Sequence, residues 1–232
     1  MAPRYANRRA PSKRMRPVGN RAVVPSPYRR SVSIPRGVRS NPTGLPNQLT
    51  VKHRFSIPTA FLQQTTAAPA VVLISCNGIF SPTSLPALKP LYFDKMSDLY
   101  DHYTVIASAL TVTAHIPSAV TLQNYATVGS YIVDDTTLIT NAQSAMEQPS
   151  SVHKLCTHEG GHVVVRNKWA SRQFFGGNTM DNDQLRGSAT TNPGEESHFA
   201  VYAYTSDASY ANVFYTVDVV YTAVWTELRD IL

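Results

Sequence analysis

The sequence predicts an all-β protein, an eight-stranded double-sheet jelly roll that follows a disordered basic N-terminal arm. Two observations predict this fold. Segments that alternate apolar and polar residues recur between about residue 49 and residue 225, as expected for half-buried strands. Several connections between these segments are long, which is typical of strands that cross between two packed sheets. We therefore divide the chain into an arm and hinge, residues 1–47, and a jelly-roll domain, residues 48–232.

The first thirty-nine residues are basic and rich in proline, with eleven basic side chains, six prolines and no acid. The basic residues are Arg4, Arg8, Arg9, Lys13, Arg14, Arg16, Arg21, Arg29, Arg30, Arg36 and Arg39. Proline removes a backbone donor, so neither a helix nor a central strand can run through this segment. The segment also has too little apolar surface to offset the entropy lost on ordering. We expect it to be disordered.

Charge separates this arm from the rest of the chain. Residues 1–39 carry a net charge of +11, whereas residues 40–232 carry ten basic and fifteen acidic residues, a net charge of −5. A basic arm on an acidic body indicates a polyanionic partner, and arginine, the main cation here, suits phosphate. The prolines disfavour the amphipathic helix of a transit peptide. A nuclear import signal at Lys13, Arg14 and Arg16 is compatible with nucleic-acid binding by the same segment.

The predicted strands begin near residues 49, 69, 103, 122, 152, 162, 198 and 213. The clearest alternation is in the last of them, where every second residue from Val213 to Trp225 is apolar or aromatic. In the first strand His53 interrupts the apolar face, and we expect a hydrogen-bonded core or interface histidine. The face predicted for the strand from 103 to 116 comprises Ile106, Leu110, Val112, Ala114 and Ile116.

Between the strands, short helices are predicted near residues 93–100 and 137–146, and a loop of about twenty-seven residues spans 170–196. Loops of this length in a compact domain are usually functional surfaces. The adjacent acid pairs at 134–135 and 195–196 fall in predicted loops, where we expect solvation or a divalent ion at a subunit contact. Cys76 and Cys156 have no partner spacing and are expected to be small buried hydrophobes.

Four basic residues of the body are additional nucleic-acid-binding candidates. Lys52 and Arg54 lie on the polar side of the first predicted strand, and Arg166 and Lys168 lie on the polar side of the strand from 163 to 169. Both pairs are opposite an apolar face, as a surface that contacts nucleic acid requires. A solvated strand face gives the same pattern, so this alternative stays open.

One motif points toward catalysis, since His158-Glu-Gly-Gly-His162 matches the HExxH pattern of zinc proteases. That chemistry needs both histidines on one helical face. Two central glycines cost a helix about 2 kcal/mol relative to alanine, and the residues that follow are strand-like. We therefore predict a hairpin turn here, with no metal and no cofactor. Phosphate-binding loops, dinucleotide fingerprints and nucleophile elbows are absent from the sequence, so no catalytic residue is assigned and no enzyme is expected.

The sequence resembles a known family at two places. Leu99-Tyr-Asp-His-Tyr-Thr-Val105, at the entry to a long strand, and the closing strand that ends in Trp225-Thr-Glu-Leu228 are similar to segments of capsid proteins from circovirus-like circular single-stranded-DNA viruses. The resemblance implies a viral-capsid-type jelly roll that assembles as sixty copies in a T=1 icosahedral shell. It implies an arm that faces the lumen, binds the genome and engages the nuclear import machinery. The locations implied are the virion and, during assembly, the host nucleus.

Three other functions remain as alternatives. A coat protein of a small or satellite RNA virus would use the same arm and fold. A monomeric nucleic-acid-binding protein usually carries positive charge on its folded surface, unlike this acidic body. A jelly-roll enzyme needs clustered histidines, whereas the seven histidines here are scattered. No apolar run reaches the length of a membrane span, so no membrane partner is expected.

The HExxH match gives a direct test. Purified protein is expected to contain essentially no zinc, because the two glycines and the β-branched residues that follow prevent the required helix. Elemental analysis of the full chain after dialysis measures this, and stoichiometric zinc would contradict the assignment.

Overall fold

The computed structural model describes residues 44–83, 88–117, 125–158, 161–206 and 212–229, so the basic arm lies outside the described residues. The described residues form nine strands and a few single-turn helices. The strands are β1 (Gln48–Gln63), β2 (Ala70–Ser75), β3 (Tyr100–His115), β4 (Tyr125–Val133), β5 (Val152–Thr157), β6 (Val163–Ala170), β7 (Arg186–Ser188), β8 (His198–Tyr204) and β9 (Asn212–Leu228). The helices are α1 (Phe93–Ser97), α2 (Ala142–Met146) and α3 (Ser171–Phe174), with 3-10 turns η1 (Thr179–Asp181) and η2 (Asp183–Leu185).

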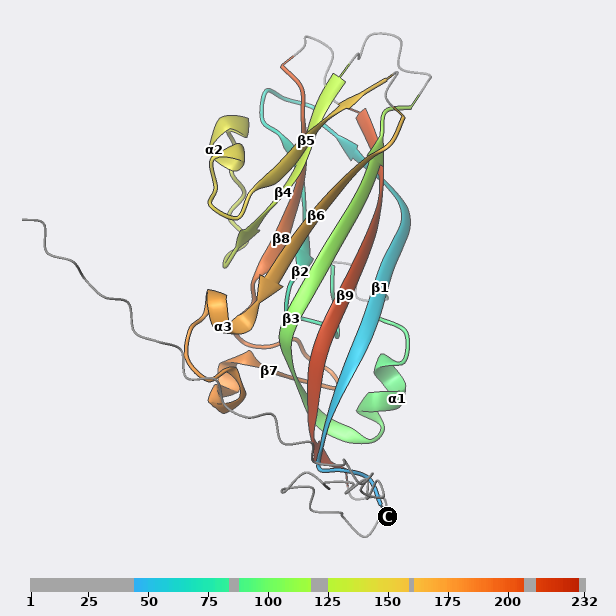
Figure 1. Cartoon of the computed structure of the whole chain (residues 1–232), viewed down its shortest axis with the longest axis vertical. Coiled ribbons are helices and arrows are strands. Elements are labelled where there is room, and N and C mark those ends of the chain that lie inside the picture. Colours follow the sequence, from blue (N-terminus) through green and yellow to red (C-terminus); the bar gives the residue numbers. More distant parts are fainter. Residues whose placement is uncertain (1–43, 84–87, 118–124, 159–160, 207–211, 230–232) are drawn as a thin grey trace, which may run out of the picture. The chain divides into compact units, whose positions relative to one another are not determined.

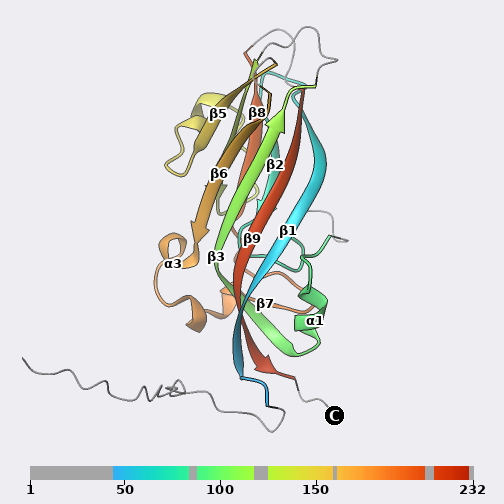
Figure 2. The ribbon, with the colours of Figure 1, turned by 45° about the vertical axis from the view of Figure 1, so that its right-hand side comes forward.

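Two antiparallel sheets make up the fold. The first has the strand order β1-β9-β3-β6, with β7 pairing to β3 beside this path, and the second has the order β2-β8-β4-β5. Figures 1 and 2 show the four long strands of the first sheet side by side, with the second sheet behind them. The chain passes back and forth between the sheets, and β9 returns to lie between β1 and β3. This arrangement is a double-sheet jelly roll, as predicted.

The connections follow the prediction only in part. The long segment between β2 and β3 crosses between the sheets, and so does the long segment between β6 and β8. The long segment between β4 and β5 does not, because these two strands pair with each other. The predicted loop at 170–196 also contains α3, η1, η2 and the ninth strand, β7. Three residues of strand are too few to give a periodic sequence signal.

The predicted face of β3 is wrong at Ile106. Val105 pairs with Ala223 and Ala107 pairs with Thr222, so β3 has one extra residue at this point. Such a bulge reverses the alternation. Tyr103 and Val105 are buried before it and Leu110 and Val112 after it, whereas Ile106 is only partly buried. Periodicity within one strand does not reveal an extra residue that only the partner strand defines.

The core lies between the two sheets, and the inner face of β9 contributes much of it. All seven residues predicted for this face are buried: Val213, Tyr215, Val217, Val219, Tyr221, Ala223 and Trp225. Cys76 and Cys156 are buried free thiols, which confirms that they act as small hydrophobes. Burial raises the pKa of both thiols, which disfavours the reactive thiolate form.

His53 is a core residue with its hydrogen bonds satisfied, as predicted. Its side chain is buried next to Trp225, whose indole Nε1 donates to His53 Nε2 at 2.9 Å. The other ring nitrogen, Nδ1, lies 3.4 Å from the carbonyl oxygen of Leu91. The indole of Trp225 also packs against Phe93 and Tyr103, with ring centroids 5.5 Å apart in both cases. The histidine therefore joins β1 to β9 and to the segment before α1.

Burial of His53 predicts a pH-dependent stability. Burial lowers the pKa of His53 below the ordinary value of 6.5, because the imidazolium form loses its hydration. Between the folded-state pKa and the ordinary value of 6.5, which applies to the unfolded chain, the unfolded chain binds more protons than the folded chain. The contribution of neutral His53 to the free energy of unfolding is complete above about pH 6.5, and it is lost as the pH falls through the folded-state pKa of His53. In His53→Gln, whose amide oxygen can still accept from Trp225, the free energy of unfolding is expected to decline less with acid.

Denaturant unfolding of the full chain between pH 8 and pH 5 measures this difference. His153→Gln is the matched control, since it replaces an exposed histidine of β5 with the same residue. Equal acid sensitivity in wild type and His53→Gln would show that His53 does not contribute.

Candidate nucleic-acid interface

The four basic residues predicted in the body share one surface. On β1, Lys52 and Arg54 point outward while their neighbours His53 and Phe55 are buried. On β6, the same alternation exposes Arg166 and Lys168, and it buries the residues on either side of Lys168. The period of two that places apolar residues in the core therefore places these cations on the outer face of the first sheet. The eleven arm residues predicted to bind nucleic acid lie outside the described residues.

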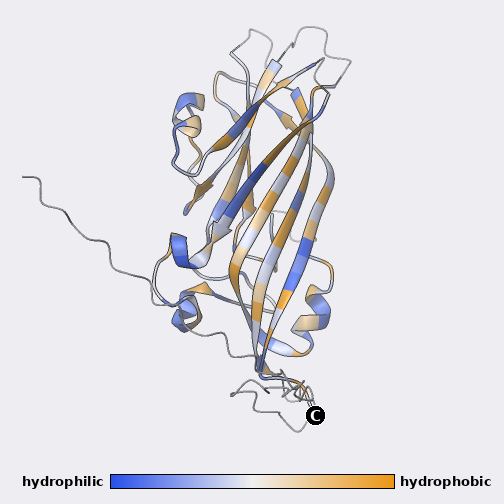
Figure 3. Cartoon of the chain, viewed as in Figure 1, coloured by the Kyte–Doolittle hydropathy of each residue, from blue (hydrophilic) through white to orange (hydrophobic). Residues whose placement is uncertain are grey.

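The strand register brings the two pairs into line. Arg54 lies opposite Val220 of β9, which lies opposite Ala109 of β3, which lies opposite Lys168 of β6. Because β1 and β6 are the two edges of this path, the cations flank the sheet and smaller residues lie between them. Three strand spacings separate the edges by about 14 Å. Figure 3 shows hydrophilic stretches on β1 and β6.

A shallow hollow lies between the two edges of the first sheet. It is lined by Lys52, Ala107, Ser108, Ala109, Lys168, Trp169, Ala170, Gln173, Val220 and Thr222. Lys52 and Lys168 are the two charged residues of this lining, and small or uncharged side chains form its floor. The sequence did not predict these floor residues, because the register of four strands decides which of them meet.

The four cations differ in their partners. Arg54 Nη2 lies 2.9 Å from Asp218 Oδ1, and Ser56 also donates to this carboxylate. The hydrogen bond from Ser56, together with Arg54, lowers the pKa of Asp218. Among the described residues, Lys52, Arg166 and Lys168 form no ion pair. The lysines are therefore better placed than Arg54 to bind an added anion.

The outer face of the second sheet is different. There Tyr131 and Tyr202 are buried with Ala145 of α2 in a small second core, so α2 covers part of this face. Carboxylates gather nearby, with Asp134 and Asp135 directly after β4 and Glu147 at the end of α2. The domain thus has one open basic sheet face and one partly covered face with acids beside it. A polyanion is attracted to the first of these.

The HExxH match lies between β5 and β6. His158 follows β5 and His162 precedes β6, and both side chains are exposed. The predicted hairpin is wrong, because β5 pairs with β4 and β6 pairs with β3, so the segment connects strands of different sheets. In the part of the chain that the structure describes, no three His, Cys, Asp or Glu residues are grouped to hold a metal.

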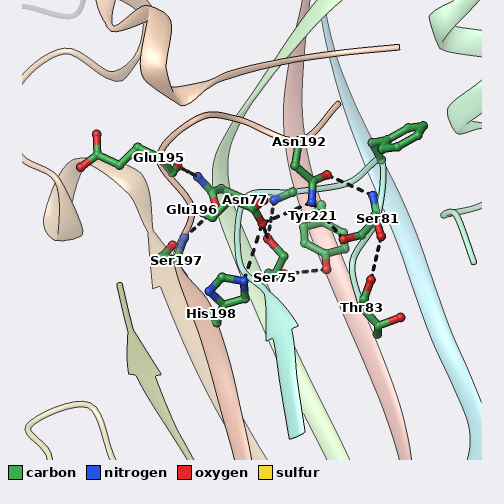
Figure 4. A network of polar contacts seen from close by, with 12 residues as sticks. Ser75, Asn77, Ser81, Thr83, Asn192, Glu195, Glu196, Ser197, His198 and Tyr221 are labelled. Atoms are coloured by element: carbon green, nitrogen blue, oxygen red, sulfur yellow. Dashed lines mark hydrogen bonds and ion pairs between the residues drawn. The ribbon is translucent and has the colours of Figure 1, made fainter. Parts of the chain in front are cut away.

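A polar network near the start of β8 has a structural role (Figure 4). Ser75 Oγ donates to Glu196 at 3.0 Å and accepts from the backbone N–H of Gly78 at 2.7 Å. Asn192 Nδ2 donates to the same carboxylate at 3.2 Å, and His198 Nε2 lies 3.7 Å from it. Serine here contacts the carboxylate and not the imidazole, so the nucleophile–base pair of a hydrolase is absent from this network. The hydrogen bonds join the segment after β2 to the segment before β8.

Comparisons with known proteins find similarity in structure alone. No family model matches the chain, and no curated protein matches it. Among solved structures, the chain is similar to Cocksfoot mottle virus, with 10% identity over 93% of this chain and 97% of that chain and a TM-score of 0.49. It is similar to Mud crab tombus-like virus, with 13% identity over 93% and 94% and a TM-score of 0.47.

A 60-mer of BFDV capsid protein is also similar, with 8% identity over 80% of this chain and 96% of that chain and a TM-score of 0.44. At these identities and TM-scores, none of the similarities assigns a function to the chain. Among the described residues, no helix is long and apolar enough to cross a membrane.

The unpaired lysines give a quantitative prediction. If Lys52 and Lys168 each contact one phosphate, replacing both with alanine should lower the slope of log affinity against log salt for a single-stranded oligonucleotide by about 1.4. Arg54→Ala should change the slope less, because Asp218 already neutralises part of its charge. Titration of a fluorescent oligothymidylate with the full chain at several salt concentrations measures both effects.

The matched control replaces Lys95 and Lys154 with alanine. Both are exposed lysines, on α1 and β5, outside the basic sheet face. An equal fall in slope for this control would contradict a specific role for the sheet face.

Proposed function

We propose that this chain is a viral capsid protein that assembles into a small T=1 icosahedral shell of sixty copies and packages a single-stranded DNA genome. The observation that carries the proposal is the division of charge. An arm of net charge +11 and no acid precedes a jelly roll of net charge −5. Lys52, Arg54, Arg166 and Lys168 share the open outer face of the first sheet, whereas acids lie beside the outer face of the second. A container for a polyanion needs cations on the surface that it directs inward.

In this proposal the arm supplies most of the genome binding. With one phosphate neutralised for each basic residue, sixty arms neutralise about 660 phosphates, a large share of a small genome. Lys52, Arg54, Arg166 and Lys168 add charge from the sheet face. Arginines that reach phosphates give affinity without sequence preference, so packaging is expected to be sequence-independent and strongly weakened by salt.

The proposal also implies where the protein is found. The mature protein belongs to the virion, and during assembly it enters the host nucleus through a signal at Lys13, Arg14 and Arg16. The arm thus has two uses, import before assembly and genome contact after it. The chain acts through assembly and binding, and it carries out no catalysis.

The coat protein of a small or satellite RNA virus is the second candidate. It is favoured by the same arm and jelly roll, since phosphate contacts do not distinguish DNA from RNA. Extraction of nucleic acid from purified particles, followed by digestion with DNase or RNase, separates the two candidates. Size-exclusion chromatography separates both from a monomeric nucleic-acid-binding protein, because a sixty-copy shell has a mass of more than a megadalton.

Deletion of residues 1–39 tests the proposal. The shortened chain should still form shells, because the jelly roll retains its core, but these shells should contain little nucleic acid. Negative-stain microscopy and the ratio of absorbance at 260 nm to that at 280 nm report assembly and content. Shells of the deletion variant that keep a full-length genome would contradict the proposal, and so would a wild-type chain that stays monomeric under all assembly conditions.

A further inference from the structure

A row of three aromatic rings crosses one end of the first sheet. Phe61 of β1 lies opposite Phe214 of β9, and His115 of β3 lies opposite Phe214 on its other side. The ring centroids of Phe61 and Phe214 are 5.1 Å apart, and those of Phe214 and His115 are 5.6 Å apart in a stacked arrangement. We call these three residues the aromatic row.

The aromatic row lies on the basic face of the sheet. Phe214 is at an outward position of β9, since its neighbours Val213 and Tyr215 are buried. Asp218 lies four residues further along β9 and therefore on the same outward face. Asp218 pairs with Thr111 of β3, and Thr111 pairs with Arg166 of β6. This places the row about 13 Å from the level of Arg166 and about 20 Å from that of Lys168. A few nucleotides of single strand span these distances.

Exposure distinguishes the aromatic row from core aromatics. The side chain of Phe61 is 46% exposed, and His115 is also exposed, although both flank the partly buried Phe214. Cross-strand aromatic pairs stabilise a sheet whether or not their faces are open to solvent. The rings of Phe61 and His115 are therefore accessible to a ligand, and the chemistry beside them indicates which ligand fits.

The charges beside the aromatic row favour an anionic ligand. In the described parts of β1, β9, β3 and β6, Asp218 is the one carboxylate at the outward positions between the aromatic row and Lys52, and it is paired with Arg54. Lys52, Arg166 and Lys168 have no acidic partner among the described residues. A ligand that is both anionic and aromatic satisfies both features, and single-stranded nucleic acid, with phosphates and unstacked bases, has this chemistry.

We propose that the aromatic row is a base-stacking site for single-stranded nucleic acid. Bases stack on Phe61, Phe214 and His115 while the adjoining phosphates contact the cations of the same sheet face. Duplex bases are already stacked on each other and cannot use the row, so it favours single strands over duplexes. This inference rests on the proposed function. It assigns to the folded domain a preference for single strands over duplexes, which phosphate binding by the arm does not provide.

Photochemical cross-linking with the full chain tests the assignment. The probe is a twenty-nucleotide oligothymidylate that contains 5-iododeoxyuridine, and the salt concentration is raised to weaken the phosphate contacts of the arm. Mass spectrometry is expected to place cross-links on Phe61, Phe214 or His115. Cross-links found only outside the row would overturn the proposal.

A double variant, Phe61→Leu with Phe214→Leu, gives the second measurement. One base stacked on one ring contributes roughly fivefold to a hundredfold in affinity, so affinity for oligothymidylate should fall by at least about tenfold. The slope of log affinity against log salt should not change, in contrast to the lysine variant, because stacking releases no counterions. Affinity for a duplex of equal length should be unaffected. Tyr92→Leu, which alters an exposed aromatic residue outside the row, is the matched control.

The outcomes separate this inference from the proposed function. A folded double variant that binds oligothymidylate like wild type overturns the stacking site, and failure of that variant to form shells would then identify the row as a contact between copies. If the double variant does not fold, the cross-links on the wild-type chain decide the question. A wild-type chain that binds neither single strand nor duplex would refute the proposed function as a whole.

Discussion

The fold depends on the insertion of the last strand between two earlier ones. β9 pairs with β1 on one side and with β3 on the other, so residues more than a hundred and fifty positions apart are hydrogen-bonded neighbours. Its inward side chains build much of the core, and its outward side chains form part of the floor between the basic edges. The same strand therefore couples stability to the proposed binding surface, because a shift of one residue in its register would exchange the inward and outward side chains.

A small group of buried polar contacts stabilises this insertion. The indole of Trp225 on β9 donates to His53 on β1, and His53 also lies against the carbonyl of Leu91. At the other side of the core, the hydroxyl of Tyr221 donates to the carbonyl of Ser75 at 2.8 Å, which joins β9 to the second sheet. Each contact satisfies a group that would be costly to bury alone, so together they favour one register over its alternatives.

The outer faces of the two sheets differ in charge and in how far they are covered, and the proposed function depends on this difference. The outer face of the second sheet is partly covered by α2 and has carboxylates beside it, whereas the outer face of the first sheet is open and basic. The arm and this face would act in different ways on the same ligand. In the proposal the arm would neutralise phosphate without selectivity. The sheet face would combine phosphate contacts with base stacking on exposed aromatic rings, which would distinguish single strands from duplexes.

The sequence by itself determined the all-β class, the jelly roll, the basic arm and the outward position of Lys52, Arg54, Arg166 and Lys168. The class, the arm and the outward cations follow from composition or from a period of two within one strand, which are local properties. The jelly roll followed from the number of strands and the long connections between them, although the long connection between β4 and β5 does not cross between sheets. The tertiary structure alone decided the bulge at Ile106, the short strand β7 and the connection between sheets at His158 and His162. It also decided that Phe61, Phe214 and His115 form one row. These residues are far apart in the chain, and strand register, which depends on both partners, brings them together.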